Sequence, residues 1–222
     1  MHGRVVCSRL RRLTHSLPRA YQSIVGRPRK DAFDEATEVR VLRAAEEIFG
    51  ERGFRAARLE DIAAAAGIRR PSLLYHFKTK GDLYVAVVTR AFEEMKAAVM
   101  GSIQVEGDFE RRLAAVVDGL VTFESEHRRL VRVIFRELID PDGSAREVVA
   151  SQFVPLVDLL SAFVTEQGKG TVPEGLPIRP AIMQLIMGHL ARASMDDLGE
   201  RLWGGDGETE RLSRALLLGK FQ

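Results

Sequence analysis

The chain has 222 residues, a length that allows one large or two small domains with a hydrophobic core. With 45% hydrophobic and 29% charged residues and no run of eighteen apolar residues, the composition predicts a globular protein, without a membrane span or wholesale disorder. Cys7 is the one cysteine, which excludes an intramolecular disulfide and fits a reducing compartment such as the cytoplasm. The five histidines have no metal-binding spacing, so we expect neither a metal nor a cofactor.

The net charge of +2 conceals a gradient. Residues 1–33 carry eight Lys/Arg against one acid, residues 34–81 nine against eight, and residues 82–222 sixteen against twenty-two. A basic end is typical of contact with a polyanion such as DNA, but a plain solvated tail has the same composition. We expect residues 1–34 to form a flexible basic arm, in which Arg27, Arg29 and Lys30 suit an extended path along a minor groove. A transit peptide, or a mis-assigned start codon that leaves residues 1–26 outside the native protein, stays open.

Apolar side chains recur at helical spacing along the chain, and no convincing strand alternation is found, so the fold class is all-α. A first helix is expected over residues 34–52, ended by Gly53, and a short second helix over residues 59–66. Pro71 suits the first turn of a third helix that ends near residue 77. Asp82 is expected to cap a fourth helix that extends to about residue 100.

Two short helices joined by a turn at Gly67, with a longer helix on either side, match the helix-turn-helix plan for placing a recognition helix in the major groove of DNA. Leu73 and Phe77 lie four residues apart and are expected to anchor the third helix to the core. The side chains left toward solvent or DNA are Arg69, Arg70, Ser72, Tyr75 and His76. We expect Arg69 and Arg70 to contact bases, and Tyr75, His76 and Lys80 to contact phosphates.

Residues 59–84, LEDIAAAAGIRRPSLLYHFKTKGDLY, resemble the DNA-binding domain of the TetR family of bacterial transcriptional regulators. The similarity rests on the alanine-rich second helix, the Ala66-Gly67 turn, the His76-Phe77 pair and a lysine three residues beyond it. Two positions depart from the family pattern. Leu74 stands where tyrosine is common, beside Tyr75, and Arg58 lies where a serine or threonine usually caps the second helix. A charge contact from Arg58 to DNA is expected in place of that hydroxyl.

The resemblance implies a helix-turn-helix domain over residues 35–95, with the motif at about 58–78, and a ligand-binding and dimerisation domain over residues 96–222. Helices are expected over residues 108–126, from His127 to about Leu138, and over 145–167 with a bend or break at Pro155. A loop follows over 168–180, and two apolar helices are expected at about 178–198 and 207–219.

Two sets of residues are candidates for the functions that the resemblance implies for the second domain. Aromatic, methionine and histidine side chains suited to a ligand pocket are Phe123, His127, Phe135, Phe153, Met187, His189 and Trp203, although ordinary packing explains most of them equally. An apolar stripe suited to a dimer interface, or equally to the intramolecular core, consists of Met183, Leu190, Leu212 and Leu216.

The function expected from these features is a homodimeric transcriptional repressor that binds a palindromic double-stranded DNA operator and leaves it when a small-molecule effector binds. Two alternatives stay open: an all-α enzyme, and a helical interaction module without specific DNA binding. No nucleophile with its base, paired carboxylates or phosphate-binding loop stands at a specific spacing, so we expect no enzyme activity. An interaction module would leave Arg69, Arg70 and Lys80 unexplained.

Overall fold

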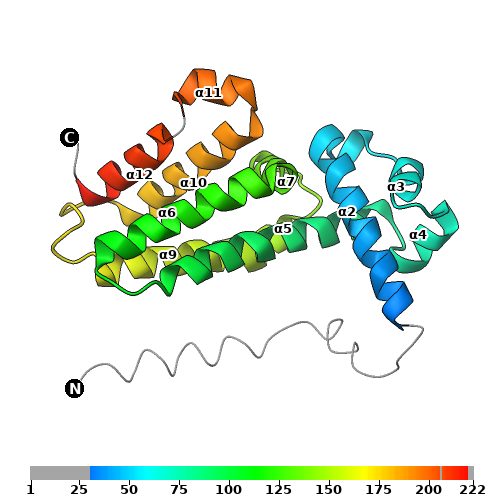
Figure 1. Ribbon diagram of the computed structural model, residues 1–222, viewed down its shortest axis with the longest axis horizontal. Coiled ribbons are helices and arrows are strands. Elements are labelled where there is room, and N and C mark those ends of the chain that lie inside the picture. The colour runs from blue at the N-terminus through cyan, green and yellow to red at the C-terminus, as the bar shows by residue number, and fades with distance from the viewer. Residues whose placement is uncertain (1–30, 206, 220–222) are drawn as a thin grey trace. The chain divides into compact units, whose positions relative to one another are not determined.

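The computed structural model describes residues 31–205 and 207–219, with side chains from residue 37 onward. The proposed arm residues Arg27, Arg29 and Lys30 therefore lie outside the described residues. The described residues from Val39 onward form one compact unit, and the packing described below is that of this unit. Every regular element of the described residues is helical, which confirms the all-α prediction (Figure 1).

Helix α2, Asp31–Ala56, contains the predicted interruption at Gly53. Gly53 adopts φ 74° and ψ 171°, a backbone conformation that a side chain disfavours, so the helix kinks there and resumes for one further turn. Val41, Ala45 and Phe49 are completely buried, as their three- and four-residue spacing predicts.

The two short helices are α3, Leu59–Ala65, and α4, Arg70–His76, drawn in cyan in Figure 1. Gly67 connects them at φ +69°, a left-handed conformation in which glycine is favoured over other residues. Ala63 is buried beneath this turn, where its small side chain allows α3 and α4 to pack closely. Leu73 and Phe77 are buried on the inner side of α4, as predicted.

Helix α5, Lys80–Ile103, begins with a capping box rather than with a cap by Asp82. The Asp82 backbone N–H donates to Thr79 Oγ1, and the Thr79 N–H donates to the Asp82 carboxylate, both at 3.0 Å. The prediction that Asp82 is the N-cap is therefore wrong. The N-cap is Thr79, three residues earlier, and Asp82 supplies the second hydrogen bond of the capping box. Leu83, Val87 and Met95 lie on the buried side of α5.

The helices that follow are α6, Phe109–Glu126, and α7, Arg128–Ile139, which agree closely with the predicted ranges. Figure 1 shows α6 lying along α5, and α10 contacts both α7 and α9. The expected helix over 145–167 is divided into α8, Arg146–Val148, a π-helical segment η3, Val149–Phe153, and α9, Val154–Gln167. The π-helical segment ends next to Pro155, where the sequence predicted a bend or break.

Residues 146–167 form the one described stretch whose length and apolar composition would suit a membrane span. Its Leu156, Val157 and Leu160 are buried in the helical core. Packing against neighbouring helices such as α10 therefore accounts for the apolar side chains at these buried positions.

The last helices are α10, Ile178–Ser194, α11, Asp197–Trp203, and α12, Glu208–Leu218. The prediction of one helix to about residue 198 is wrong, because the chain breaks at Asp196 and begins the separate helix α11. Asp196 adopts φ 49°, which is unusual for a residue with a side chain. Its carboxylate pairs with Arg128 and Arg132 of α7, and these two ion pairs hold the break in place.

Candidate functional site

The outer side of α4 presents polar and cationic side chains, while its inner side is fixed to the core. Leu73 is completely buried, and Arg69, Arg70 and Ser72 are exposed at the N-terminal end of the same helix. Arg69 has an extended backbone and precedes the first helical residue, so its side chain leaves the helix at its tip. This places two guanidinium groups on one exposed helix end.

Arg70 is held by a partner within the helix-turn-helix segment. Its Nε lies 3.1 Å from Glu60 Oε1, and both side chains are more than half exposed. Ion pairs of this kind contribute only about 0–1 kcal/mol, so water, phosphate or a base can replace the carboxylate at little cost. The pair orients Arg70 without burying it.

Tyr75 and His76 occupy the C-terminal end of the same helix. Tyr75 is 67% exposed, and its ring meets the His76 ring edge-on with 5.4 Å between centroids. Lys78 Nζ lies 5.8 Å from the Tyr75 ring centroid. A phenol, an imidazole and an ammonium group therefore gather at the end of α4, as expected for contacts to a phosphate backbone.

Lys80 has intramolecular partners that the sequence did not indicate. Its ammonium group donates to the carbonyls of Arg55 at 3.3 Å and Ala57 at 3.0 Å, and lies 4.6 Å from the Phe54 ring centroid. In this structure Lys80 holds the end of α2 rather than pointing to solvent, which corrects its expected orientation. Arg58 is exposed at the start of α3, and its side chain makes no capping hydrogen bond.

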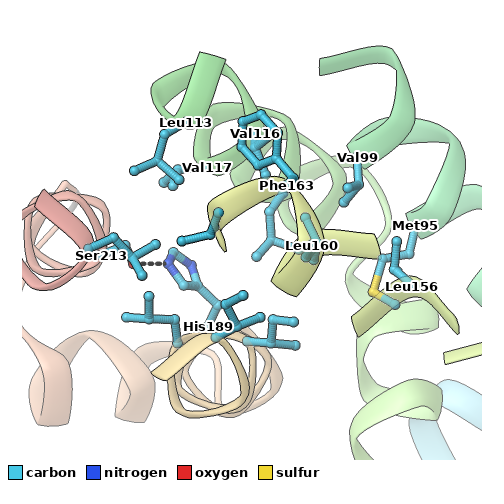
Figure 2. Close-up of a pocket in the computed structure, with 16 residues that line it drawn as sticks. Met95, Val99, Leu113, Val116, Val117, Leu156, Leu160, Phe163, His189 and Ser213 are labelled. Carbon is cyan, nitrogen blue, oxygen red and sulfur yellow. Dashed lines mark hydrogen bonds between the residues drawn. The ribbon is translucent and has the colours of Figure 1, made fainter. Parts of the chain in front are cut away.

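An apolar cavity with a volume of about 60 Å³ lies among α5, α6, α9, α10 and α12. Its wall consists of fourteen apolar side chains together with His189 and Ser213. Figure 2 shows the His189 ring directed from α10 into this space, joined to Ser213 of α12 by a hydrogen bond. The lining contains no Lys, Arg, Asp or Glu.

Of the seven pocket candidates, only His189 lines this cavity. Phe123 and Phe153 are buried elsewhere, where they pack against His127 and Phe92 with ring centroids 5.1 Å and 5.5 Å apart. The remaining candidates that do not line it are His127, Phe135, Met187 and Trp203. The residues missed are aliphatic ones such as Leu113, Val116 and Leu160, which the helical spacing identified only as core.

His189 is the centre of a buried polar chain. Its Nε2 lies 2.9 Å from Ser213 Oγ, and its Nδ1 lies 3.4 Å from Glu124 Oε2. Ser213 Oγ in turn donates to the Thr209 carbonyl at 2.8 Å. With the hydroxyl proton in that bond, we assign His189 Nε2–H as the donor toward Ser213.

Ser213, His189 and Glu124 thus follow the order of hydroxyl, imidazole and carboxylate found in nucleophilic hydrolases. Ser213 lies inside α12, however, where backbone N–H groups bond to the preceding helical turn. Such a serine has no neighbouring backbone donors to stabilise an oxyanion. The arrangement is therefore suited to binding a polar group rather than to acyl transfer.

The interface candidates differ in their exposure. Leu190 is completely buried within the chain, so its assignment to a dimer interface is wrong and it belongs to the intramolecular core. Leu212 is 51% exposed, and Met183 and Leu216 are half-buried. The sequence missed Leu198 and Leu202 on α11, which are 46% and 62% exposed.

A polar joint links α2 and α5 to α7. Arg136 Nη1 donates to the carbonyls of Phe49 and Gly50, each at 2.9 Å, just before the kink at Gly53. The Tyr84 hydroxyl donates to Glu137 Oε2 at 3.0 Å, and the Ala145 N–H donates to Glu137 Oε1 at 2.7 Å. Burial, reinforced by the Glu137 carboxylate, raises the pKa of Tyr84, so its hydroxyl keeps its proton at neutral pH.

Residues 41–87 match the family described as "Bacterial regulatory proteins, tetR family". Over 114 residues the chain is 32% identical to the HTH-type transcriptional activator FasR of Mycolicibacterium smegmatis, a match that covers 50% of this chain and about half, 52%, of FasR. Residues 41–87 therefore form a DNA-binding domain of the TetR family. The chain is also 23% identical over 180 residues to the HTH-type transcriptional repressor SCO4008 of Streptomyces coelicolor, which covers 80% of this chain and 90% of SCO4008.

Solved structures resemble this chain in fold. A TetR-like transcriptional regulator from Rhodococcus sp. RHA1 has a TM-score of 0.67 at 21% identity, covering 86% of this chain and 96% of the other. The fatty acid degradation regulator FadR from Bacillus halodurans has a TM-score of 0.68 at 18% identity, covering 84% and 96%. The resemblance that the Ala66-Gly67 turn and the His76-Phe77 pair indicated is confirmed.

Proposed function

We propose that the protein is a homodimeric transcriptional repressor that binds operator DNA through α4 and leaves it when a small molecule occupies the cavity of its C-terminal domain. The proposal rests chiefly on one observation: Arg69, Arg70 and Ser72 are exposed on the end of a helix whose other side is fixed by Leu73 and Phe77. Regulators of the TetR family bind DNA operators and usually act as dimers. The proposed domains are an arm over residues 1–34, a DNA-binding domain over 35–95 and an effector domain over 96–222, in a cytoplasmic protein.

In the proposed complex, α4 enters the major groove with its N-terminal end. Arg69 and Arg70 bond guanine O6 and N7, and Arg70 exchanges Glu60 for the base edge. Tyr75, His76 and Arg58 contact phosphates, and the basic arm with Arg27, Arg29 and Lys30 follows a minor groove. Lys80 contributes by holding the end of α2 against α5.

The proposed dimer uses the exposed apolar side chains of α11 and α12. Leu198, Leu202 and Leu212 are each about half exposed or more, and burying them against a second copy removes that apolar surface from water. Leu216 and Met183 are half-buried and are proposed to contribute to the same interface. A two-fold dimer presents two copies of α4, which is why the operator is proposed to be palindromic.

Helix α5 is the proposed link between the cavity and DNA. Its Met95 and Val99 line the cavity, while Tyr84, three turns earlier, is bonded to Glu137 at the joint with α7. A ligand that prefers one position of α5 changes the spacing of the two α4 helices in the dimer. A coupling free energy of about 1–3 kcal/mol changes operator affinity roughly 5- to 150-fold.

Two relatives carry opposite regulatory names, since FasR is called an activator and SCO4008 a repressor. Repression is therefore tested separately from DNA binding. Genomic fragments that the purified full chain retains would be sequenced, and the recovered site would be placed before a reporter gene. The proposal predicts a palindromic site and a reporter signal that rises when the regulator gene is deleted. Fragments without a shared sequence would contradict operator binding, and a signal that falls on deletion would contradict repression.

A further inference from the structure

The lining of the C-terminal cavity determines what kind of molecule it can hold. We propose that the cavity binds a neutral aliphatic molecule with a single oxygen group, an alcohol or a ketone, and discriminates against carboxylates and amines of the same length. This inference rests on the proposed function only in taking the cavity as the effector site. The ligand class itself follows from the apolar wall and from the polar chain at His189.

The polar end of the cavity offers one acceptor and one donor. Ser213 Oγ donates to the Thr209 carbonyl at 2.8 Å and accepts from His189 Nε2 at 2.9 Å. A hydroxyl oxygen has two lone pairs, so Ser213 retains one that can accept from the hydroxyl of an alcohol. A ketone oxygen would instead take the place of Ser213 as the acceptor for His189 Nε2–H.

An anionic head group is disfavoured by the charges around this end. No Lys or Arg lines the cavity, and the Glu124 carboxylate lies directly behind the imidazole, 3.4 Å from Nδ1. His189 is the one group of the cavity lining that can carry a positive charge, and the Glu124 carboxylate is already paired with its Nδ1. A buried carboxylate ligand would therefore share this one ring with a second carboxylate, without a cation of its own. Burying a charge without a partner costs far more than burying a hydroxyl.

A cationic head group is also disfavoured in the cavity. The His189 ring separates the cavity from Glu124, so an ammonium group in the cavity reaches only the Ser213 oxygen. Glu124 Oε1 has no hydrogen-bond partner among the described residues, but Glu124 lines a different, polar hollow with Arg128 and Arg192. Neutral molecules are thus the class that this cavity accommodates.

The size of the cavity limits the chain length. One buried water needs roughly 10–15 Å³ of such cavity volume. The cavity of about 60 Å³ therefore has room for a row of a few waters or for a medium-length alkyl chain. Leu120 and Leu185 line the cavity and are only half-buried, so their side chains can change rotamer as a ligand enters. Eight-carbon compounds are therefore the probes of choice.

The test uses the full chain and isothermal titration calorimetry at pH 7.5 with 1-octanol, 2-octanone, octanoate and octylammonium. We expect the Kd of 1-octanol and of 2-octanone to be at least about tenfold lower than that of either ion, a difference of about 1.4 kcal/mol in binding free energy. Ser213→Ala should weaken the binding of 1-octanol about tenfold and leave the binding of 2-octanone unchanged, because His189 Nε2–H remains available to the ketone. Ser161→Ala is the matched control, as Ser161 Oγ makes the same helical bond, to the Val157 carbonyl at 2.7 Å, but does not line the cavity.

A second variant, Val116→Phe, fills the cavity and should abolish binding of both neutral ligands while circular dichroism shows an unchanged helical content. Octanoate binding as tightly as 1-octanol, or equal effects of Ser213→Ala and Ser161→Ala, would overturn the proposed ligand class. The same samples are tested for operator release by gel shift, which separates the two proposals. Octanoate that binds tightly and releases DNA contradicts the ligand class alone, whereas 1-octanol that binds without altering DNA affinity contradicts the regulatory function alone.

Discussion

Replacing Arg136 by alanine should loosen the joint between the DNA-binding helices and α7. Arg136 donates to the carbonyls of Phe49, Gly50 and Glu51, at 2.9, 2.9 and 3.4 Å, where α2 approaches its kink at Gly53. Hydrogen bonds to charged groups contribute about 1.5–3 kcal/mol each, but these share one half-exposed guanidinium, so we expect a total loss of about 2 kcal/mol. For a chain of 222 residues this lowers Tm by about 4–8 °C.

The measurement is urea unfolding followed by circular dichroism, with Arg146→Ala as the control. Arg146 is exposed and donates to one carbonyl, that of Pro141, at 2.8 Å, so its removal should change the free energy of unfolding by less than about 0.5 kcal/mol. Hydrogen exchange of the amides near Gly53 should accelerate only in Arg136→Ala. Equal effects of the two substitutions on stability and exchange would refute the assignment of Arg136 to this joint.

Three further predictions concern other sites. Lys80→Met should lower the free energy of unfolding by about 1 kcal/mol and leave the salt dependence of DNA binding unchanged, whereas loss of a phosphate contact would reduce the salt slope by about one. Burial raises the pKa of Glu46 from 4.5. The free energy of unfolding of the wild type, relative to that of Glu46→Gln, should therefore be greatest below pH 4.5 and fall as pH rises through the folded pKa. A difference between the two proteins that does not depend on pH in urea unfolding would contradict this. Leu212→Glu should shift the protein toward monomer in analytical ultracentrifugation, and Arg211→Ala, on the same exposed turn, serves as the control because it changes the net charge by the same one unit.

Helix boundaries could be predicted because their signals are local. Gly53, Gly67 and Pro71 impose backbone conformations that depend little on tertiary contacts, and each lies where the sequence placed a break or a start. The break at Asp196 could not be predicted in this way. Its left-handed backbone is supported by Arg128 and Arg132, which lie more than sixty residues earlier in the chain.

The cavity and the role of Lys80 depend on which helix faces meet, and spacing within one helix does not contain that information. Aromatic residues such as Phe123 and Phe153 were natural candidates for a pocket, yet they pack where helices approach closely, and the open space is left among aliphatic residues. His189 was a candidate because pockets commonly combine an apolar wall with one or two polar groups, and it does line the cavity. Leu190 was misassigned because an apolar stripe is the same whether it faces its own chain or a second copy.

The exposed N-terminal end of α4 is proposed to read base edges. Fluorescence anisotropy would be measured for the selected operator and its single-base-pair variants, with the wild type, Arg70→Ala and Tyr75→Phe. We expect Arg70→Ala to remove about 1–3 kcal/mol of discrimination at one base pair in each half-site, and Tyr75→Phe to weaken binding to all sequences alike. If Arg70→Ala instead weakened every sequence equally and kept all discrimination, Arg70 would be a backbone contact and the assignment of α4 as the reading helix would be contradicted.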